Sequence, residues 1–369
     1  MTNHEVYMDL ALDNARAMKG QTDPNPLVGS VIVNDNRIVG VGTHLKAGEP
    51  HAEIHALRMA GELAKGGTIY VTLEPCSHHG RTGPCAEAIV KAGIKKAVIA
   101  TLDPNPLVAG NGVKILKDAG IEVITGVRQA EAWKMNEVFN KFIVEKKPFI
   151  TLKAGITLDG KVASHSYNSK WITSEEARHD VHHLRNENMA ILVGINTALK
   201  DNPALTTRIP NGRNPIRVVL DSTLKLPLDY QLVTDKEAET WIFTSRRFDE
   251  QKKQQLEEIG IKVFVTKSQE HVDPVEVVEV LGENGVSSLI IEGGGNVNAS
   301  FLEHKLIDKV VLYIAPKLIG GKDAPTFLEG AGIELMKDAI ELTDTQMLPV
   351  GKDFKFIGYP KYNEPRDAS

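Results

Sequence analysis

Short apolar runs alternate with amphipathic stretches along the chain. In the first part, runs rich in β-branched residues and bounded by turn residues predict strands at 27–33, 38–42, 68–73, 97–101 and 121–124. Between and around them, apolar residues at helical spacing predict helices at 1–20, 52–64, 84–92, 111–119 and 129–144. This alternation is typical of an α/β fold, in which helices cover the faces of a sheet.

A second alternating series follows a charged turn that ends at Pro148. Its predicted strands begin at Phe149 and continue at 190–193, 216–220, 241–244, 262–265, 288–291 and 309–314. A chain of 369 residues also exceeds what a single hydrophobic core usually supports. We therefore predict two α/β domains in series, with boundaries at 1–147 and 148–369.

Composition narrows the class of protein. Hydrophobic residues make up 42% of the chain and charged residues 25%, as in an ordinary globular protein. The net charge of −5, without a block of Lys or Arg, argues against nucleic acid as the main partner. No apolar run has the length of a membrane span, and we expect no secretory or transit segment. We expect a cytoplasmic homo-oligomer that acts on a small molecule.

Both cysteines of the chain lie in one short window. Cys76 follows Pro75, Cys85 lies nine positions later, and the triplet His51-Ala52-Glu53 precedes them. A hydrolytic zinc site uses three nitrogen or sulfur ligands and keeps a fourth position for water, and His51, Cys76 and Cys85 would supply the three. Glu53 would carry protons between this water and a leaving amine. The pattern is that of zinc nucleobase deaminases, with a longer gap between the cysteines.

Simpler explanations exist for each of these residues alone. Buried cysteines can be small hydrophobes, and a zinc ion can be structural, although structural sites normally have four protein ligands. The occurrence of all these residues together in one motif favours a catalytic metal.

The hexapeptide Asp-Pro-Asn-Pro-Leu-Val occurs twice, at 23–28 and 103–108. Its prolines fix a turn that would aim Asn25 at the edge of a ring, unless the turn has only a structural role.

A triple glycine, Gly293 to Gly295, lies between the predicted strand 288–291 and a predicted helix at 296–303. Such a loop lets backbone amides approach a phosphate, but it can also be merely a tight connection. It does not match the G-x-G-x-x-G fingerprint of a Rossmann fold.

Several ordered motifs together carry a family resemblance. Besides the zinc motifs, they are Leu152-Lys153-Ala154, Leu158-Asp159-Gly160-Lys161, Ser169-Lys170-Trp171-Ile172-Thr173, Leu192-Val193-Gly194-Ile195-Asn196-Thr197, Asp201-Asn202-Pro203, Glu292-Gly293-Gly294-Gly295 and Ala315-Pro316-Lys317. Over almost its whole length, the chain resembles the bifunctional riboflavin biosynthesis enzymes, in which a pyrimidine deaminase is fused to a reductase. The resemblance implies a cytidine deaminase-like zinc domain followed by a dihydrofolate reductase-like domain, which would explain the missing Rossmann fingerprint.

For the first domain, the resemblance implies zinc-dependent deamination of 2,5-diamino-6-ribosylamino-4(3H)-pyrimidinone 5′-phosphate. Water activated by one Zn²⁺ would attack the carbon that bears the 2-amino group, and Glu53 would move the proton. The implied substrate residues are Asn25, His44, His78 and Arg81. Arg81 would meet the phosphate, since a guanidinium can grip phosphate with two hydrogen bonds. A surface histidine remains the alternative for His44.

For the second domain, the resemblance implies that NADPH reduces the ribosyl group of the product to ribityl. The implied cofactor positions are Ala154, Trp171, Thr197, Asp201, Ser222, Gly294, Gly295, Asn296, Val297, Asn298, Ala299 and Ser300. The implied substrate positions are Lys153, Ser169, Arg185, Leu205, Arg208 and Glu292. Alternatives are a surface position for Lys153, a core position for Trp171 and a helix cap for Glu292.

Two residues depart from the family pattern, Gly83 where proline is frequent and Asn111 where a basic residue is common.

A rival interpretation is a tRNA or nucleobase zinc deaminase with an accessory nucleotide-binding domain. That class favours a short gap between the cysteines, a basic face and no second catalytic domain, and the sequence shows none of these features.

Overall fold

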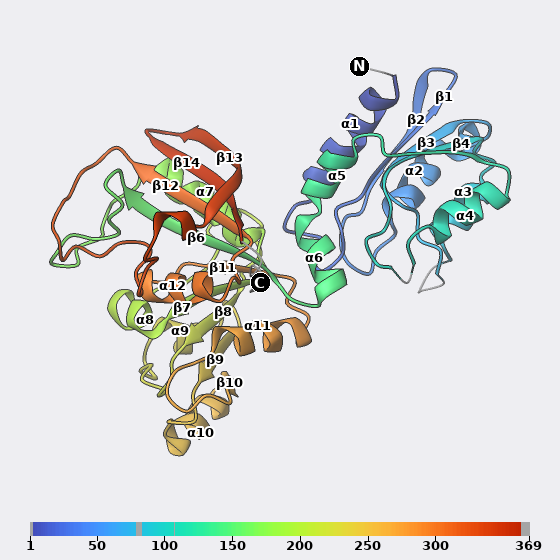
Figure 1. Cartoon of the computed structure of the whole chain (residues 1–369). Helices are drawn as coiled ribbons and strands as arrows, with labels where there is room; N and C mark the ends of the chain where they lie inside the picture. Colours follow the sequence, from blue (N-terminus) through green and yellow to red (C-terminus); the bar gives the residue numbers. More distant parts are fainter. Residues whose placement is uncertain (1–2, 79–82, 107, 363–369) are drawn as a thin grey trace, which may run out of the picture. The chain divides into compact units, whose positions relative to one another are not determined.

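The computed structural model describes residues 3–78, 83–106 and 108–362. The chain forms two compact units, one up to Lys146 and the other from Lys147 onward (Figure 1). Each unit is built around its own sheet.

The first unit contains a five-stranded sheet in the order β2-β1-β3-β4-β5. β1 is antiparallel to both of its neighbours, whereas β3, β4 and β5 are parallel. The strands are β1 (Gly29–Asn34), β2 (Arg37–Thr43), β3 (Thr68–Leu73), β4 (Lys96–Thr101) and β5 (Glu122–Thr125). The helical segments are α1 (Asn3–Arg16), α2 (Ala52–Ala60), the 3₁₀ turn η1 (Gly61–Ala64), α3 (Cys85–Lys91), α4 (Asn111–Asp118), α5 (Gln129–Met135) and α6 (Glu137–Glu145).

Helices cover both faces of this sheet. Ile69 and Val71 of β3 pack with α2, α3 and α4, while Tyr70 between them packs with α1 and α5 on the opposite face. Since successive side chains of a strand point to opposite faces, an uninterrupted apolar strand is buried on both sides. The result is a three-layer α/β/α arrangement that places α2 and α3 on the same face (Figure 1).

The single helix predicted over 129–144 is wrong, because the structure divides it at Asn136. The Asn136 side chain accepts a hydrogen bond from Leu27 N at 2.8 Å and donates one to Leu27 O at 2.9 Å. An asparagine that pairs with a distant backbone leaves helical geometry at its own position. The helix predicted over 1–20 likewise ends earlier, at Arg16, and the one over 52–64 ends as η1.

The second unit contains a nine-stranded sheet in the order β10-β9-β8-β7-β11-β6-β12-β14-β13. Its strands from β10 to β12 are parallel, and β14 and β13 add an antiparallel edge. The strands are β6 (Phe149–Thr157), β7 (Ala190–Gly194), β8 (Ile216–Leu220), β9 (Thr240–Thr244), β10 (Lys262–Val265), β11 (Ser288–Ile291), β12 (Lys309–Ala315), β13 (Glu341–Val350) and β14 (Asp353–Lys361).

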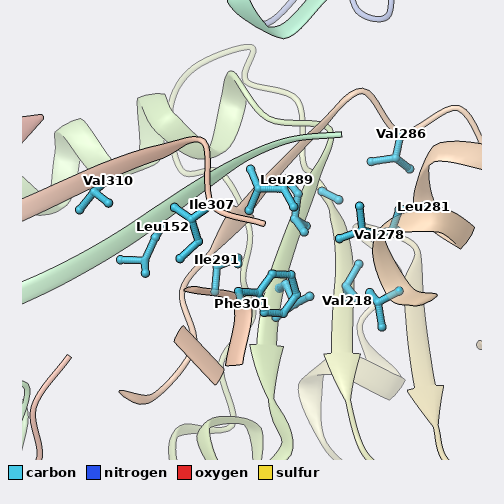
Figure 2. Close-up of a cluster of buried hydrophobic side chains, with 14 of the residues drawn as sticks. Leu152, Val218, Val278, Leu281, Val286, Leu289, Ile291, Phe301, Ile307 and Val310 are labelled. Carbon is cyan, nitrogen blue, oxygen red and sulfur yellow. The ribbon is translucent and has the colours of Figure 1, made fainter. Parts of the chain in front are cut away.

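Helices again cover both faces of the sheet. They are α7 (Glu175–Asn186), α8 (Ile195–Asp201), α9 (Gln231–Thr234), α10 (Glu250–Glu258), α11 (Pro274–Glu283), α12 (Gly295–Glu303) and the 3₁₀ turn η2 (Met336–Asp338). On one face, Leu289 and Ile291 of β11 pack with Phe301 of α12 and with Val278 and Leu281 of α11 (Figure 2). On the other face, α8, α9 and α10 contribute to a separate buried cluster.

β13 and β14 were not predicted from the sequence. Alternating apolar residues on both sides of Gly351 are typical of a hairpin and were the available signal. β13 forms one edge of the sheet, and its Met347 side chain is 55% exposed. In the part of the chain that the structure describes, none of the helices is long and apolar enough to cross a bilayer.

Candidate active sites

The three predicted zinc ligands lie together in the first unit. The Nδ1 atom of His51 is 3.5 Å from Cys76 Sγ and 3.3 Å from Cys85 Sγ, and the ligand atoms all lie within 4.8 Å of one another. Around a tetrahedral zinc, nitrogen and sulfur ligands are separated by about 3.6 Å. The donor set therefore fits zinc, and among the described residues it has three members, which leaves a coordination position for water.

Two close backbone contacts place these donors. His51 is the N-cap of α2, and a side-chain carbon at Gly42 of β2 would lie 2.1 Å from Ala52 O in the first turn of that helix. A side-chain carbon at Gly112 would lie 2.0 Å from Pro75 O, directly before Cys76. Only glycine permits both approaches. Cys85 begins α3, so two of the three donors lie at helix starts, where a thiolate is stabilised.

Glu74 supports the loop of Cys76 in a way that the sequence analysis missed. Its carboxylate accepts hydrogen bonds from the backbone N–H groups of Asp103 at 3.2 Å, Gly110 at 2.9 Å and Val113 at 3.1 Å. These contacts connect the segment that begins at Asp103, the start of the second Asp-Pro-Asn-Pro sequence, to Glu74, directly before Pro75. The only sequence signal was an acid next to the Pro-Cys step.

Glu53 lies in the first turn of α2, close to the donor group, and its side chain is buried with 3% exposure. Burial raises the pKa of Glu53 to about 7. The hydrogen bond with Cys85 lowers the pKa of the Cys76 thiol. Cys76 is therefore favoured as a thiolate even without a bound metal. A carboxyl group next to a metal-bound water can accept and return a proton.

Asn25 and His44 form a hydrogen-bonded pair beside the donors. The Nδ2 atom of Asn25 lies 3.0 Å from His44 Nε2, and His44 Nδ1 lies 3.2 Å from Pro50 O. Since a carbonyl can only accept, His44 donates from Nδ1 and accepts from Asn25. Burial lowers the pKa of His44, which matches this neutral tautomer. The alternative of a surface histidine is wrong, because His44 is 2% exposed.

This arrangement orients the Asn25 amide, so that its oxygen can accept from a ring N–H. The His44 ring lies 5.5 Å from the His51 ring, edge to face, which places the pair next to the metal donors. His78 is exposed on the loop after Cys76. Arg81 lies outside the described residues.

A cavity of 590 Å³ in the second unit brings together many of the predicted reductase residues. Those that line it are Lys153, Ser169, Trp171, Arg185, Asp201, Leu205 and Arg208. They come from β6, from the segment before α7, from α7 itself, from the end of α8 and from the segment after it. Further lining residues that the sequence analysis missed include Arg178, His182 and Tyr313.

Glu292 organises the cations on one side of this cavity. It accepts hydrogen bonds from Arg185 Nε at 2.8 Å, Arg185 Nη2 at 3.0 Å and Lys153 Nζ at 3.2 Å. Burial acts to raise the pKa of Glu292, but Arg185 and Lys153 outweigh it and hold the pKa well below its usual range. The alternatives of a surface lysine and a helix-cap acid are both wrong, since Lys153 and Glu292 form a largely buried ion pair.

Trp171 is not a core aromatic residue, because 63% of it is exposed. The Arg178 guanidinium lies 4.3 Å from the centroid of its ring, and Lys317 Nζ donates to its backbone oxygen at 2.7 Å. The indole therefore has a cation on one face while much of its surface remains accessible at the cavity.

The other predicted cofactor positions do not line the cavity but lie mostly at one edge of the sheet. Thr197 follows β7, Ser222 follows β8, and the segment Gly294 to Ser300 follows β11, all at the carboxyl ends of parallel strands. A side-chain carbon at Gly294 would lie 3.8 Å from Thr197 Oγ1, so these two segments are neighbours. Ligands of α/β sheets bind at this edge. Ala154 is buried within β6.

His182 of α7 faces the cavity, and its Nδ1 atom is buried without a hydrogen-bond partner in the structure. Burial, followed by the charges of Arg185 and Arg208, lowers the pKa of His182 to about 4. This histidine is therefore uncharged at neutral pH. In sequence it was one of several histidines in a polar helix and carried no distinguishing signal.

Comparisons with known proteins identify the family of each unit. Residues 1–101 match the cytidine and deoxycytidylate deaminase zinc-binding region, and residues 148–356 match the RibD C-terminal domain. The chain belongs to the RibD family. It is 48% identical over 364 residues to the riboflavin biosynthesis protein RibD of Bacillus amyloliquefaciens, covering 98% of each chain.

Two solved structures of the family share the fold over almost the whole chain. RibD of Acinetobacter baumannii (form 1) has a TM-score of 0.87 at 38% identity, with 97% of this chain and 99% of that chain covered. A diaminohydroxyphosphoribosylaminopyrimidine deaminase/5-amino-6-(5-phosphoribosylamino)uracil reductase of Thermotoga maritima has a TM-score of 0.83 at 36% identity, with the same coverage. The chain is thus a bifunctional enzyme of riboflavin biosynthesis with a cytidine deaminase-like domain and a reductase domain. Family membership favours this assignment over a nucleic-acid deaminase.

Proposed function

We propose that the first domain, residues 1–147, deaminates 2,5-diamino-6-ribosylamino-4(3H)-pyrimidinone 5′-phosphate, and that the second, residues 148–369, reduces the ribosyl group of the product with NADPH. The observation that carries the deaminase proposal is the group of His51, Cys76 and Cys85 beside the buried Glu53. The two activities by which the Thermotoga maritima relative is named support both the substrate and the order of the two reactions.

In the deaminase site, His51, Cys76 and Cys85 would hold Zn²⁺, which when bound makes a water molecule acidic enough to attack at neutral pH. Glu53 would take the proton from the nucleophile and deliver it to the leaving amine. The Asn25 amide, oriented by His44, would accept a hydrogen bond from the pyrimidine. His78 and Arg81 would complete the pocket, with Arg81 on the 5′-phosphate.

In the reductase site, the cavity would hold the sugar of the substrate against the nicotinamide of NADPH. Lys153 lies in the wall of this cavity and would polarise the reacting carbon, while Glu292 fixes its ammonium group. Arg185, Arg208, Ser169 and Leu205 would bind the substrate, the arginines through its phosphate. The loop from Gly294 to Ser300, with Thr197, Asp201, Ser222, Trp171 and Ala154, would hold the dinucleotide, since the first backbone amides of a helix have no partner within the helix and α12 has no side-chain cap.

One coupled assay tests both halves. The diamino substrate is supplied with zinc-loaded protein and NADPH, and ammonia release and NADPH loss are recorded together. We expect ammonia to appear first and NADPH oxidation to follow it. NADPH oxidation without release of ammonia would contradict the proposed order of the reactions.

The variant Glu53→Gln separates metal binding from catalysis. Gln preserves the shape of the side chain but cannot shuttle a proton, so we expect zinc to be retained and deamination to fall by roughly 100-fold or more. Glu62→Gln in η1 is the matched control, because this glutamate is exposed and lies outside the donor group. Unchanged turnover in Glu53→Gln would refute the proposed role of Glu53.

We also propose that the protein is a cytoplasmic homo-oligomer that binds neither nucleic acid nor membranes. The exposed edge strand β13 and the 48% exposed Phe354 on β14 support a subunit interface. The net charge of −5 supports the absence of nucleic acid. Sedimentation equilibrium at several concentrations tests the oligomer, and a single monomer species would contradict it.

A further inference from the structure

The segment that carries Trp171 has little regular secondary structure of its own. Between the end of β6 at Thr157 and the start of α7 at Glu175, the only regular pairing is an isolated bridge from Lys161 to Thr326. The position of the indole therefore depends on contacts made by other elements. Two cationic side chains from distant parts of the second unit supply such contacts.

Arg178 acts from the first turns of α7. The carbon of its guanidinium lies 4.3 Å from the centroid of the Trp171 ring, well within the range of a cation–π contact. Its Nη1 atom also donates to Thr173 O at 2.7 Å. The Arg178 guanidinium thus contacts both the ring of Trp171 and the backbone at Thr173.

Lys317 acts from the segment after β12. Its Nζ atom donates to Trp171 O at 2.7 Å and to Ile172 O at 2.6 Å. Leu158 N donates to Lys317 O at 2.9 Å, which ties the beginning of the same segment to this lysine. The backbone at Trp171 is therefore held by an element other than the one that holds its ring.

The other residues of the cavity indicate which part of a bound ligand would contact the exposed face of the Trp171 indole. Trp171 lines the cavity together with Lys153 and Ser169, the proposed substrate positions. Hydride transfer requires the nicotinamide, and not the adenine, to be in contact with the substrate. A planar, electron-poor ring stacks favourably on an indole, and stacking on Trp171 would cover part of a side chain that is 63% exposed.

We propose that Arg178 and Lys317 are positioning residues that hold Trp171 as a stacking surface for the nicotinamide ring of NADPH. The inference rests on the proposed reductase function and extends it to two residues that are not among the predicted cofactor positions. Arg178 acts through the ring of Trp171, and Lys317 acts through its backbone.

The test uses the full-length, zinc-loaded protein in a double-mutant cycle. The variants are Arg178→Leu, Lys317→Met, Trp171→Ala and Trp171→Ala/Arg178→Leu, with Arg178→Lys as the conservative replacement. His179→Leu is the matched control, because His179 is the next residue of α7 and is exposed. The KM for NADPH and kcat are measured with the deaminated substrate, and thermal unfolding confirms that each variant is folded.

We expect Arg178→Leu and Lys317→Met each to raise the KM for NADPH by roughly three- to tenfold, with a smaller effect on the KM for the sugar phosphate. Arg178→Lys should lie between Arg178→Leu and the wild-type protein, and His179→Leu should equal the wild-type protein. In the Trp171→Ala background, Arg178→Leu should add less than about twofold, because the contact through which Arg178 acts is already absent.

A second readout needs no cofactor. Acrylamide quenching of Trp171 emission, taken as the difference from Trp171→Ala, should increase in Arg178→Leu because the guanidinium no longer covers the ring. If NADPH oxidation is normal and Arg178→Leu behaves as His179→Leu, the inference is wrong. An equal effect of Arg178→Leu with and without Trp171 also overturns it. If the wild-type protein oxidises no NADPH, the reductase proposal fails. Unchanged acrylamide quenching in Arg178→Leu would separately refute the proposal that Arg178 covers and positions the Trp171 ring.

Discussion

Replacing Glu292 by Gln removes the one negative charge that neutralises two cations in the wall of the reductase cavity. The side chain of Glu292 is 11% exposed, and those of Lys153 and Arg185 are each 14% exposed. Gln has the same shape, but its amide group presents N–H where a cationic donor needs an acceptor. Lys153 and Arg185 would then be left as like charges with little access to water.

Removing one partner of a buried, hydrogen-bonded ion pair costs about 3–5 kcal/mol, because the remaining charge stays uncompensated. Three hydrogen bonds from two cations are lost or weakened here, so we expect a value within this range. For a unit of this size, about 2–4 °C of melting temperature corresponds to 1 kcal/mol, so the reductase transition should fall by roughly 10 °C. Differential scanning calorimetry of the full-length protein without ligands measures it.

Glu239→Gln is the matched control. Glu239, directly before β9, pairs with Lys262 at the start of β10, but the two side chains are 61% and 56% exposed, and an exposed pair contributes at most about 1 kcal/mol. The transition of this variant should therefore shift by only a few degrees. If Glu292→Gln shifts the transition no more than Glu239→Gln does, the argument from buried charge is refuted.

Three further predictions concern pH, the zinc loop and metal removal. Because the pKa of His182 is lowered to about 4, its contribution to stability should be present above about pH 6.5 and be lost as the pH falls toward 4. His182→Gln should flatten the pH dependence of urea unfolding in this window, and identical slopes would contradict the assignment. Glu74→Gln should destabilise the first unit by about 2 kcal/mol and weaken zinc binding in a chelator competition, since one acceptor oxygen of its three N–H contacts is replaced by a donor. Chelation of zinc should lower the unfolding temperature of the deaminase transition and leave the reductase transition unchanged; a shift of both would show that the units do not unfold independently.

Local sequence signals were sufficient where a residue type has one dominant use. The Pro75-Cys76 step, Cys85 and the His51-Ala52-Glu53 triplet indicated a metal site, because few other roles require this combination. The alternation of strand-like and helical runs likewise predicted sheets with helices on their faces, and the two buried clusters around β3 confirm this for the first unit.

Long-range partners were beyond the reach of such signals. Nothing near Asn136 in the sequence shows that it pairs with Leu27, 109 positions away, and this pairing divides the predicted helix. Similarly, Glu74 is one acid among many until its carboxylate is seen to accept three backbone N–H groups. Arg178 and Lys317 lie 139 positions apart and converge on a segment with little secondary structure of its own.

The sequence by itself determined the fold class and the family of the protein, and it predicted the zinc donors and the acid–base glutamate. These depend on residue identity and on spacing along the chain, which periodicity and motifs record directly. Only the tertiary structure decided how the polar groups are paired: which tautomer His44 adopts, that Glu292 neutralises two cations, and that the exposed Trp171 contacts Arg178 and Lys317. The physical reason is that protonation, charge compensation and exposure depend on neighbours in space, and those neighbours are brought together only when the sheets form and their connecting segments pack.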